Sequence, residues 1–282
     1  MPTYNFGVVV DDIDMAITHV IRGDDHVNNT PRQIHIFRAL GKPLPEFGHV
    51  PMILGADGER LSKRHGAVSV TQYRDEGYLP EALLNYLARL GWSHGDDEIF
   101  SMHQFIEWFD LAHVSRSPAQ FNPEKLAWLN QQYIKAASDA RLAELIEPEL
   151  RKRSVQLAAG PALEKVVHLV KDRASSLIQL ADEAMLFYQI EVNPGTPDWD
   201  EAAEKGLRML KARLATVAWE RAAINEVIKE TVKSSGLKMP QLAMPLRRLV
   251  TGRTQTPSID AVLELIGRET VLARLARHLE ED

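Results

Sequence analysis

Apolar runs of strand length occur only near the start of this chain, and helical patterns follow for the rest of it. The runs cover residues 6–10, 18–21 and 50–54. Continuous apolar runs of this length are typical of strands buried on both faces of a parallel sheet. Thr30-Pro31 predicts the start of a helix between the second and third runs. The sequence therefore predicts an α/β unit of about three strands, fewer than the five or six typical of an independent doubly wound domain.

A chain that begins almost directly with a strand looks like the continuation of a domain, so we expect a first half-domain to be missing. The length of 282 residues predicts two or more domains. The absence of cysteine excludes disulfides, thiolate metal sites and a cysteine nucleophile, and it fits a cytoplasmic protein. No apolar run approaches membrane-spanning length. The net charge of −6 argues against sequence-independent coating of nucleic acid but permits docking on local basic patches.

Helical periodicity and helix-starting residues continue from about residue 71 to the end, without a strand pattern beyond about residue 75. Leu79-Pro80-Glu81 opens a helix that ends at Gly91, with Leu83, Leu84, Leu87 and Leu90 expected on one face. Ser138 caps a later helix, in which Pro148 is expected to end or kink the chain. The linker at 193–197 predicts a domain or subdomain boundary. Further helices are expected at 101–109, 123–135, 161–180, 182–190, 200–213, 217–233, 239–251, 258–266 and 268–280.

The loop at residues 55–67 combines three glycines with a basic run, directly after the third apolar run. Ser62 and backbone N–H groups can donate to phosphate oxygens, and the Lys63 ammonium can follow charge that develops on them. This chemistry suits the polyphosphate of a nucleotide. A solvated basic turn explains the Ser-Lys-Arg triplet equally well when the flanking sequence is ignored.

Arg22, Asp24 and Asp25 follow the second apolar run, at the strand end where ligands bind in open α/β sheets. Arg22 can bind a carboxylate, but a salt-bridged turn is the simpler explanation of these residues alone. Tyr4 offers a hydroxyl near the same sheet edge, although most such tyrosines only pack. The ten histidines lack the spacing of a metal site, so we predict no bound metal.

A second basic patch surrounds Arg247, Arg248 and Arg253, within a stretch punctuated by proline and glycine. Such a patch can bind phosphates or stack on bases, although surface arginines without partners are more common. The five tryptophans are expected to anchor the cores of the domains rather than to stack on bases.

Taken together, these residues resemble those of bacterial glutamyl-tRNA synthetases. Order, spacing and identity agree over about ninety residues, far beyond the chance level of a short motif, and the match extends more loosely to the C-terminus. The matching segments are Pro2-Thr3-Tyr4-Asn5-Phe6, Val20-Ile21-Arg22-Gly23-Asp24-Asp25-His26, Asn29-Thr30-Pro31, Leu54-Gly55-Ala56-Asp57-Gly58, Leu61-Ser62-Lys63-Arg64-His65-Gly66-Ala67 and Leu79-Pro80-Glu81-Ala82-Leu83-Leu84.

The resemblance implies a cytoplasmic, monomeric class I synthetase that activates glutamate with ATP and Mg²⁺ and transfers it to tRNA-Glu. The implied fold is an α/β remnant, the second half of a Rossmann-type catalytic domain, followed by a stem-contact region and an all-α anticodon-binding region. The expected boundaries are 1–56 for the Rossmann part, 57–137 for the KMSKS loop and stem-contact fold, and 138–192 and 193–282 for two helical anticodon-binding subdomains.

The resemblance also implies roles for individual residues. Lys63 is the expected catalytic residue, and Tyr4 and Arg22 are the expected glutamate contacts. Arg60 stands where the family's KMSKS signature usually has lysine, which keeps the charge. Residues implied for ATP binding are Asp25, Ile53, Arg60, Leu61, Ser62, Lys63 and Arg64, and those implied near the anticodon are Arg173, Arg247 and Thr256.

The other class I signature, His-Ile-Gly-His or a close variant, does not occur among the 282 residues. We therefore expect this polypeptide to be inactive by itself, and the alternative is a tRNA-binding module without catalysis. A paralogue that transfers glutamate to modified tRNA bases is less favoured, because such proteins lack a helical anticodon-binding region. A glutaminyl-tRNA synthetase is also less favoured, because its anticodon-binding part is rich in strands.

Overall fold

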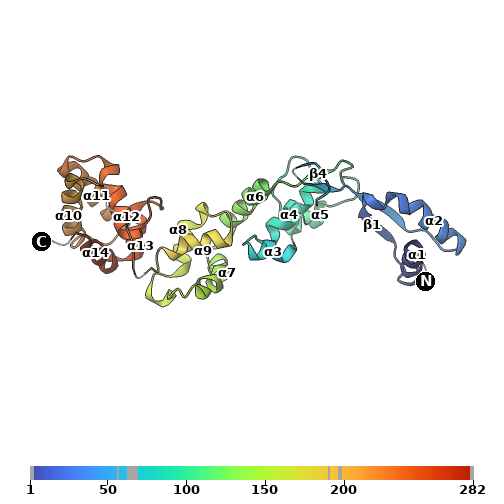
Figure 1. The fold of residues 1–282 in the computed structure, drawn as a ribbon, viewed down its shortest axis with the longest axis horizontal. Coiled ribbons are helices and arrows are strands. Elements are labelled where there is room, and N and C mark those ends of the chain that lie inside the picture. The colour runs from blue at the N-terminus through green and yellow to red at the C-terminus, as the bar shows by residue number, and fades with distance from the viewer. Residues whose placement is uncertain (1–2, 56, 62–68, 190, 196–198, 280–282) are drawn as a thin grey trace. The chain divides into compact units, whose positions relative to one another are not determined.

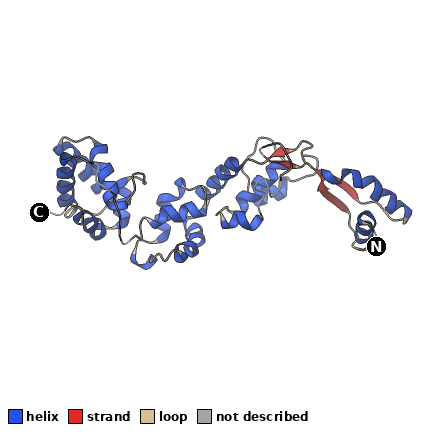
Figure 2. Ribbon diagram, viewed as in Figure 1, coloured by secondary structure: helices blue, strands red, loops and turns tan. Residues whose placement is uncertain are grey.

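The computed structural model describes residues 3–55, 57–61, 69–189, 191–195 and 199–279. The chain divides into two compact units, Met1–Tyr133 and Ile134–Asp282. Helices make up most of both units, and the strands lie in the first unit (Figures 1 and 2). The predicted change from an α/β beginning to a helical remainder is therefore confirmed.

The first unit begins with a two-stranded parallel sheet and two helices. Strands β1 (His19–Gly23) and β2 (Glu46–Val50) pair in a register that sets Arg22 opposite His49. The chain crosses between them through the 3₁₀ helix η1 (Asp24–Asn29) and α2 (Thr30–Ala39), which has proline in its first turn as the sequence predicts. Helix α1 (Tyr4–Asp14) packs against α2. The carboxyl ends of both strands consequently meet at one edge of the sheet.

The prediction of a strand at residues 6–10 is wrong, since these residues lie inside α1. Phe6, Val9, Val10 and Ile13 have the i, i+3, i+4, i+7 spacing of a helical face, and a short apolar run cannot distinguish the two structures. Strand β1 is also not buried on both faces, because Ile21 remains 50% exposed.

The third apolar run is divided between two sheets. β2 ends at Val50, and after Pro51 the chain forms β3 (Ile53–Leu54), which pairs in parallel with β4 (Ala119–Gln120). The expectation of no strand after residue 75 is therefore wrong. A two-residue strand carries no periodicity in the sequence, so only its tertiary partner reveals it.

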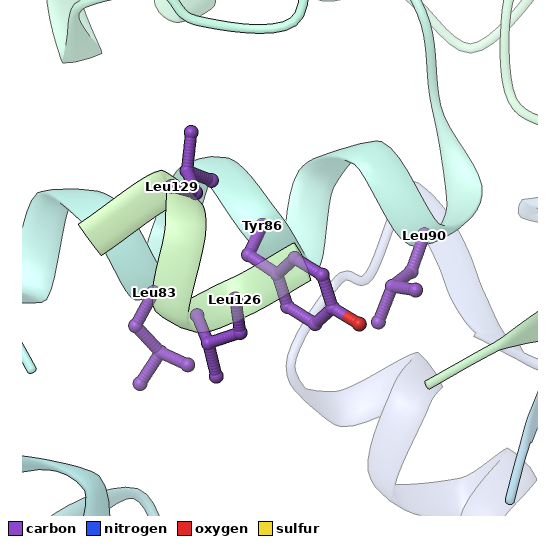
Figure 3. Close-up of a cluster of buried hydrophobic side chains, with 5 residues drawn as sticks. All are labelled: Leu83, Tyr86, Leu90, Leu126 and Leu129. Atoms are coloured by element: carbon purple, nitrogen blue, oxygen red, sulfur yellow. The ribbon is translucent and has the colours of Figure 1, made fainter. Parts of the chain in front are cut away.

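Three helices and most of a fourth, α6, complete the first unit around a compact apolar cluster. Leu83, Tyr86 and Leu90 of α4 meet Leu126 and Leu129 of α6 (Figure 3). Leu84 and Leu87 do not share this buried face as predicted, because they are 46% and 39% exposed. Ser101 forms a capping box at the start of α5. The helices are α3 (Val70–Asp75), α4 (Pro80–Gly91), α5 (Met102–Trp108) and α6 (Pro123–Ala136).

The second unit is built from helices among its described residues. Ser138 caps α7 as predicted, but the helix continues through Pro148 to Lys152 rather than ending there. The helix expected over 161–180 is interrupted by the 3₁₀ helix η4 (Lys171–Arg173), after which Ser176 caps a new helix. Helices α7, α8 and α9 pack together, as do α10 with α11 and α12 with α14.

The helices of this unit are α7 (Asp139–Lys152), α8 (Leu163–Val170), α9 (Leu177–Met185), α10 (Glu201–Leu214), α11 (Arg221–Ser235), α12 (Met239–Thr251), α13 (Ile259–Ile266) and α14 (Arg268–Ala276), with a further 3₁₀ helix, η3, at Leu157–Ala159.

Asn85 joins three segments of the first unit through its buried side chain. Its amide donates to the Glu98 carbonyl at 3.1 Å, and its Oδ1 accepts from the Phe100 N–H at 3.2 Å and from the Tyr133 hydroxyl at 2.7 Å. Burial raises the pKa of Tyr133 to about 12, so its hydroxyl remains a donor at neutral pH.

Replacing Asn85 with alanine should lower the free energy of unfolding by about 2–4 kcal/mol, because buried backbone groups lose their partners. Denaturant unfolding followed by circular dichroism measures this change. Leu84→Ala, at the neighbouring exposed position of α4, is the matched control and should cost less than about 0.5 kcal/mol. Equal effects of the two substitutions would contradict a structural role for the Asn85 amide.

Candidate functional site

Arg22 lies near the carboxyl end of β1, where it is held by neighbours from α2. Its terminal NH2 donates to Thr30 Oγ1 at 2.9 Å and to Gln33 Oε1 at 2.8 Å. The guanidinium carbon also lies 5.7 Å from the centre of the Phe47 ring on β2. The Nε atom is buried and has no hydrogen-bond partner among the described residues. The cation is thus fixed by neutral oxygens and an aromatic face rather than by a carboxylate hydrogen bond.

Two polar side chains that the sequence analysis did not select support Arg22. Gln33 is only 1% exposed, and its amide also donates to Asn5 Oδ1 of α1 at 3.1 Å. His49 Nε2 lies 3.0 Å from Thr30 Oγ1. The sequence does contain a signal that could have identified Gln33. It is a polar residue beside Ile34, Ile36 and Phe37 in a predicted helix, and buried polar side chains usually have hydrogen-bond partners.

The positive charge of Arg22 and the surrounding burial change how nearby groups titrate. Burial lowers the pKa of His49, and the charges of Arg22 and His26 lower it further against the opposing effect of Asp24. Burial raises the pKa of Asp12, an effect that Arg22 opposes. The neutral form of His49 is therefore favoured at pH 7.

Tyr4 lies in the first turn of α1 and reaches the same edge. Its hydroxyl is 3.4 Å from His26 Nδ1, and the side chain is exposed. His26 Nδ1 is also 3.3 Å from Asn29 Nδ2, and the Thr30 hydroxyl donates to the His26 carbonyl at 3.4 Å. The two residues expected to contact a substrate, Tyr4 and Arg22, are thus joined through one polar cluster.

A tight turn after β3 returns the chain toward this edge. The Gly55 N–H donates to the Glu59 carbonyl at 2.8 Å, and the Leu61 N–H donates to the Ile53 carbonyl at 2.9 Å. Gly58 has a φ of +80°, which favours glycine. As a result Arg60 reaches Asp25, with its NH2 3.1 Å from Oδ2.

The residues expected to bind ATP differ in their surroundings and in how far they are exposed. Asp25 and Arg60 form an ion pair, and the Arg60 side chain is 65% exposed. Ile53 packs against the apolar cluster shown in Figure 3, and Leu61 is half-buried. Ser62, Lys63 and Arg64 lie outside the described residues.

In the second unit, the three residues expected near the anticodon lie close together. Arg247 Nε donates to Thr256 Oγ1 at 2.7 Å, and Arg173 NH1 donates to the Thr256 carbonyl at 3.4 Å. Burial lowers the pKa of Arg247, and the charge of Arg173 adds to that effect. Arg173 and Thr256 are 83 positions apart along the chain. Arg173 and Arg247 thus form one cationic cluster around Thr256, which is 8% exposed.

An open groove of about 780 Å³ borders this cluster. Arg173 and Arg253, from two separate segments of the second unit, line it together with Glu183. Arg253 NH1 lies 3.4 Å from Glu183 Oε2, and its NH2 donates to the Asp182 carbonyl at 2.8 Å. The sequence analysis placed Arg253 in the second basic patch but did not select Glu183, and the sequence gives no spacing that links the two residues.

Across the described ranges there is no group of three or more side chains suited to holding a metal ion. None of the described helices is both long and apolar enough to cross a bilayer.

Two family models match this chain in succession. The catalytic domain of "tRNA synthetases class I (E and Q)" matches residues 1–128, and an "Anticodon binding domain" matches residues 141–279. The chain therefore consists of a class I tRNA synthetase catalytic region followed by an anticodon-binding domain. The predicted order of a partial Rossmann-type region and an all-α region is confirmed by this match.

Individual relatives agree along almost the whole chain. The "Glutamate--tRNA ligase" of Nitrosospira multiformis is 60% identical over 99% of this chain, and that of Nitrosomonas europaea is 62% identical over 99%. A crystal structure of a glutamate tRNA ligase from Elizabethkingia meningosepticum, in complex with its amino acid, has a TM-score of 0.84 and 31% identity over 99% of this chain. The chain spans 61% of the length of the first two relatives and 60% of the third, in line with the expected partial length.

The pKa of His49 provides a test of the Arg22 cluster. Arg22→Met should raise that pKa while leaving it below the ordinary value of about 6.5, because burial is the larger cause. Ring NMR signals followed through a pH titration measure the change. Arg38→Met, an exposed cation of α2, is the matched control and should leave the pKa unchanged.

The lowered pKa of His49 also determines the direction in which the stability of the fold changes with pH. Since folding favours the neutral ring, the His49 contribution to stability is present above about pH 6.5 and is lost as the pH falls toward its folded pKa. An unaltered His49 titration in Arg22→Met would contradict the electrostatic coupling of these two residues.

Proposed function

We propose that this chain provides part of a glutamate–tRNA ligase, which activates glutamate with ATP and Mg²⁺ and transfers it to tRNA-Glu. The observation that carries the proposal is the identity of about 60% to glutamate–tRNA ligases along 99% of the chain. The Arg22 cluster and the Arg60–Asp25 pair, gathered at one sheet edge, support it from the structure. A cytoplasmic, monomeric protein is part of the same proposal.

Arg22 is suited to bind a carboxylate of glutamate. Its two hydrogen-bond acceptors are neutral oxygens, so they hold the guanidinium in place without neutralising its charge. Preorganised cations of this kind bind carboxylates without a cost of reorientation. We assign the Tyr4 hydroxyl, which belongs to the same cluster, to a second polar contact with the amino acid.

Activation consists of attack by a glutamate carboxylate on the α-phosphorus of ATP, with pyrophosphate as the leaving group. We assign Lys63 and Arg60 to the negative charge that develops on the phosphates. Ser62 and Arg64 belong to the same signature and are assigned to ATP as well. Asp25, Ile53 and Leu61 complete the proposed ATP site. Mg²⁺ enters with ATP as part of the substrate. The proposed domain boundaries remain 1–56, 57–137, 138–192 and 193–282.

The alternative is a tRNA-binding module without catalysis. It is favoured by the absence of the His-Ile-Gly-His signature from these 282 residues, and by a cationic cluster in the second unit that needs no residue of the first. Arg173, Arg247 and Thr256 are assigned to the anticodon in both versions.

An exchange assay separates the two versions. The chain alone, with tRNA-Glu, should not exchange pyrophosphate into ATP, and addition of the segment that relatives carry and this sequence lacks should restore exchange. In the restored mixture Lys63→Ala should lower the rate by about 100-fold or more. Lys152→Ala, an exposed lysine at the end of α7, is the control. Exchange by the chain alone would refute the proposed dependence, whereas tRNA binding without restored exchange would favour the binding module.

The anticodon assignment predicts a change in preference rather than in overall affinity. Arg247→Gln should reduce the preference for the cognate transcript over anticodon-altered transcripts by about 10-fold, because a base contact is lost. Filter binding of the transcripts at fixed salt measures this ratio. Arg151→Gln, which removes the same charge from an exposed position of α7, should leave the ratio unchanged. Uniform weakening across all transcripts would instead assign Arg247 to a phosphate.

A further inference from the structure

A smaller cavity lies next to the groove of the second unit, at the start of α10 and along α12. It has a volume of about 370 Å³, and Trp199, Met244, Arg248 and Thr254 are among its lining residues. This volume is at the lower end of the range of about 300–1,000 Å³ that small-molecule pockets occupy. The sequence analysis assigned Trp199 to a domain core, but its side chain is only half-buried and lines this cavity.

The walls of the cavity have fixed positions in the fold. Trp199 immediately precedes Asp200, whose Oδ1 caps α10 by accepting from the Ala203 N–H at 2.8 Å. Met244 and Arg248 are four residues apart on α12, so they lie on the same face of that helix. Met244 is 45% exposed and lines the cavity, so part of it is accessible to a ligand.

The Arg248 guanidinium is positioned by the backbone of the linker. Its Nε and NH2 donate to the Pro194 carbonyl at 3.2 and 3.0 Å. Gly195 adopts a φ of +70°, and a Cβ there would lie 3.1 Å from the Arg248 NH2. Glycine at 195 therefore allows the guanidinium to lie close against the chain, in a fixed orientation at the rim of the cavity.

The cavity adjoins the groove, and the two share lining residues. Arg248 and Thr254 line both, and the groove adds Arg173 and Arg253 against one carboxylate, Glu183. A ligand that fills the cavity and continues along the groove must therefore join a flat or apolar group to an anionic chain. Single-stranded RNA combines these two features, whereas an apolar peptide segment has no group for the arginines.

We propose that the Trp199 cavity receives one unstacked nucleobase of an RNA loop, with the adjoining phosphates along the groove. The indole ring and the Met244 thioether provide the stacking surface, and Arg248 and Thr254 provide polar contacts at its rim. This inference rests on the proposed function as a tRNA-binding chain, and it adds a base-binding position separate from Arg247 and Thr256.

The test uses the full chain and an RNA hairpin with the sequence of the tRNA-Glu anticodon arm. Trp199→Ala should weaken binding by about 5- to 100-fold, the effect of losing one base–aromatic stack, and Trp199→Phe should restore most of it. Met244→Ala should also weaken binding, whereas Met239→Ala, the other exposed methionine of α12, is the matched control. Thermal unfolding of each variant verifies that the fold is retained.

A second arm identifies the base. Hairpins in which each loop base in turn is replaced by an abasic site should show one position at which Trp199→Ala causes no further loss. If the wild-type chain binds the hairpin but Trp199→Ala binds it equally well, the cavity does not receive a base and the proposed function stands. If the wild-type chain binds neither the hairpin nor the whole tRNA, the proposed function fails and this inference fails with it.

Discussion

The parallel pairing of β1 with β2 determines where the chemistry of the first unit lies. Because both strands end at the same edge, Arg22 and His49 become direct neighbours across the sheet. The crossover between the strands then supplies Thr30 and Gln33, whose oxygens fix the Arg22 guanidinium. A shift of the register by one residue would turn Arg22 toward the opposite face and break both hydrogen bonds. The site thus depends on backbone pairing first and on side-chain identity second.

Arginines in this chain differ in function according to what they are bonded to. Arg274 is 4% exposed and donates to the backbone carbonyls of Val250 and Gln189, so it ties the end of α12 to another segment. Arg253 is paired with Glu183 and the Asp182 carbonyl. Among the described residues, the hydrogen-bond acceptors of Arg22 are neutral side chains, and its guanidinium has an aromatic neighbour. Its charge therefore remains available to an anionic ligand, which is a different state from burial as a structural tie.

Local signals in the sequence identified much of the fold, and tertiary contacts supplied the rest. Proline and serine at helix starts located α2, α5 and α7 because capping depends on adjacent residues. The apolar run in α1 is compatible with both strand and helix, and β4 is too short to have a period. At the site, motif order selected Arg22, Asp25 and Arg60 one by one. The pairing of Asp25 with Arg60, and the contacts of Gln33 and Glu183, arise only when distant segments meet.

The two cations at the edge of the sheet are held with different strength, and this difference suits two kinds of substrate group. Arg22 is half-buried, and its NH2 is held by two oxygens while the Phe47 ring lies next to the guanidinium, so it can select a single carboxylate by position. Arg60 is exposed and, within the described ranges, is paired with Asp25, an interaction of the kind worth about 0–1 kcal/mol in water. Exchange of that carboxylate for a phosphate oxygen therefore costs little. A rigid cation for the amino acid and a readily exchanged one for the polyphosphate would suit the adenylate formation proposed above, because the phosphates change charge during the reaction while the recognised carboxylate does not.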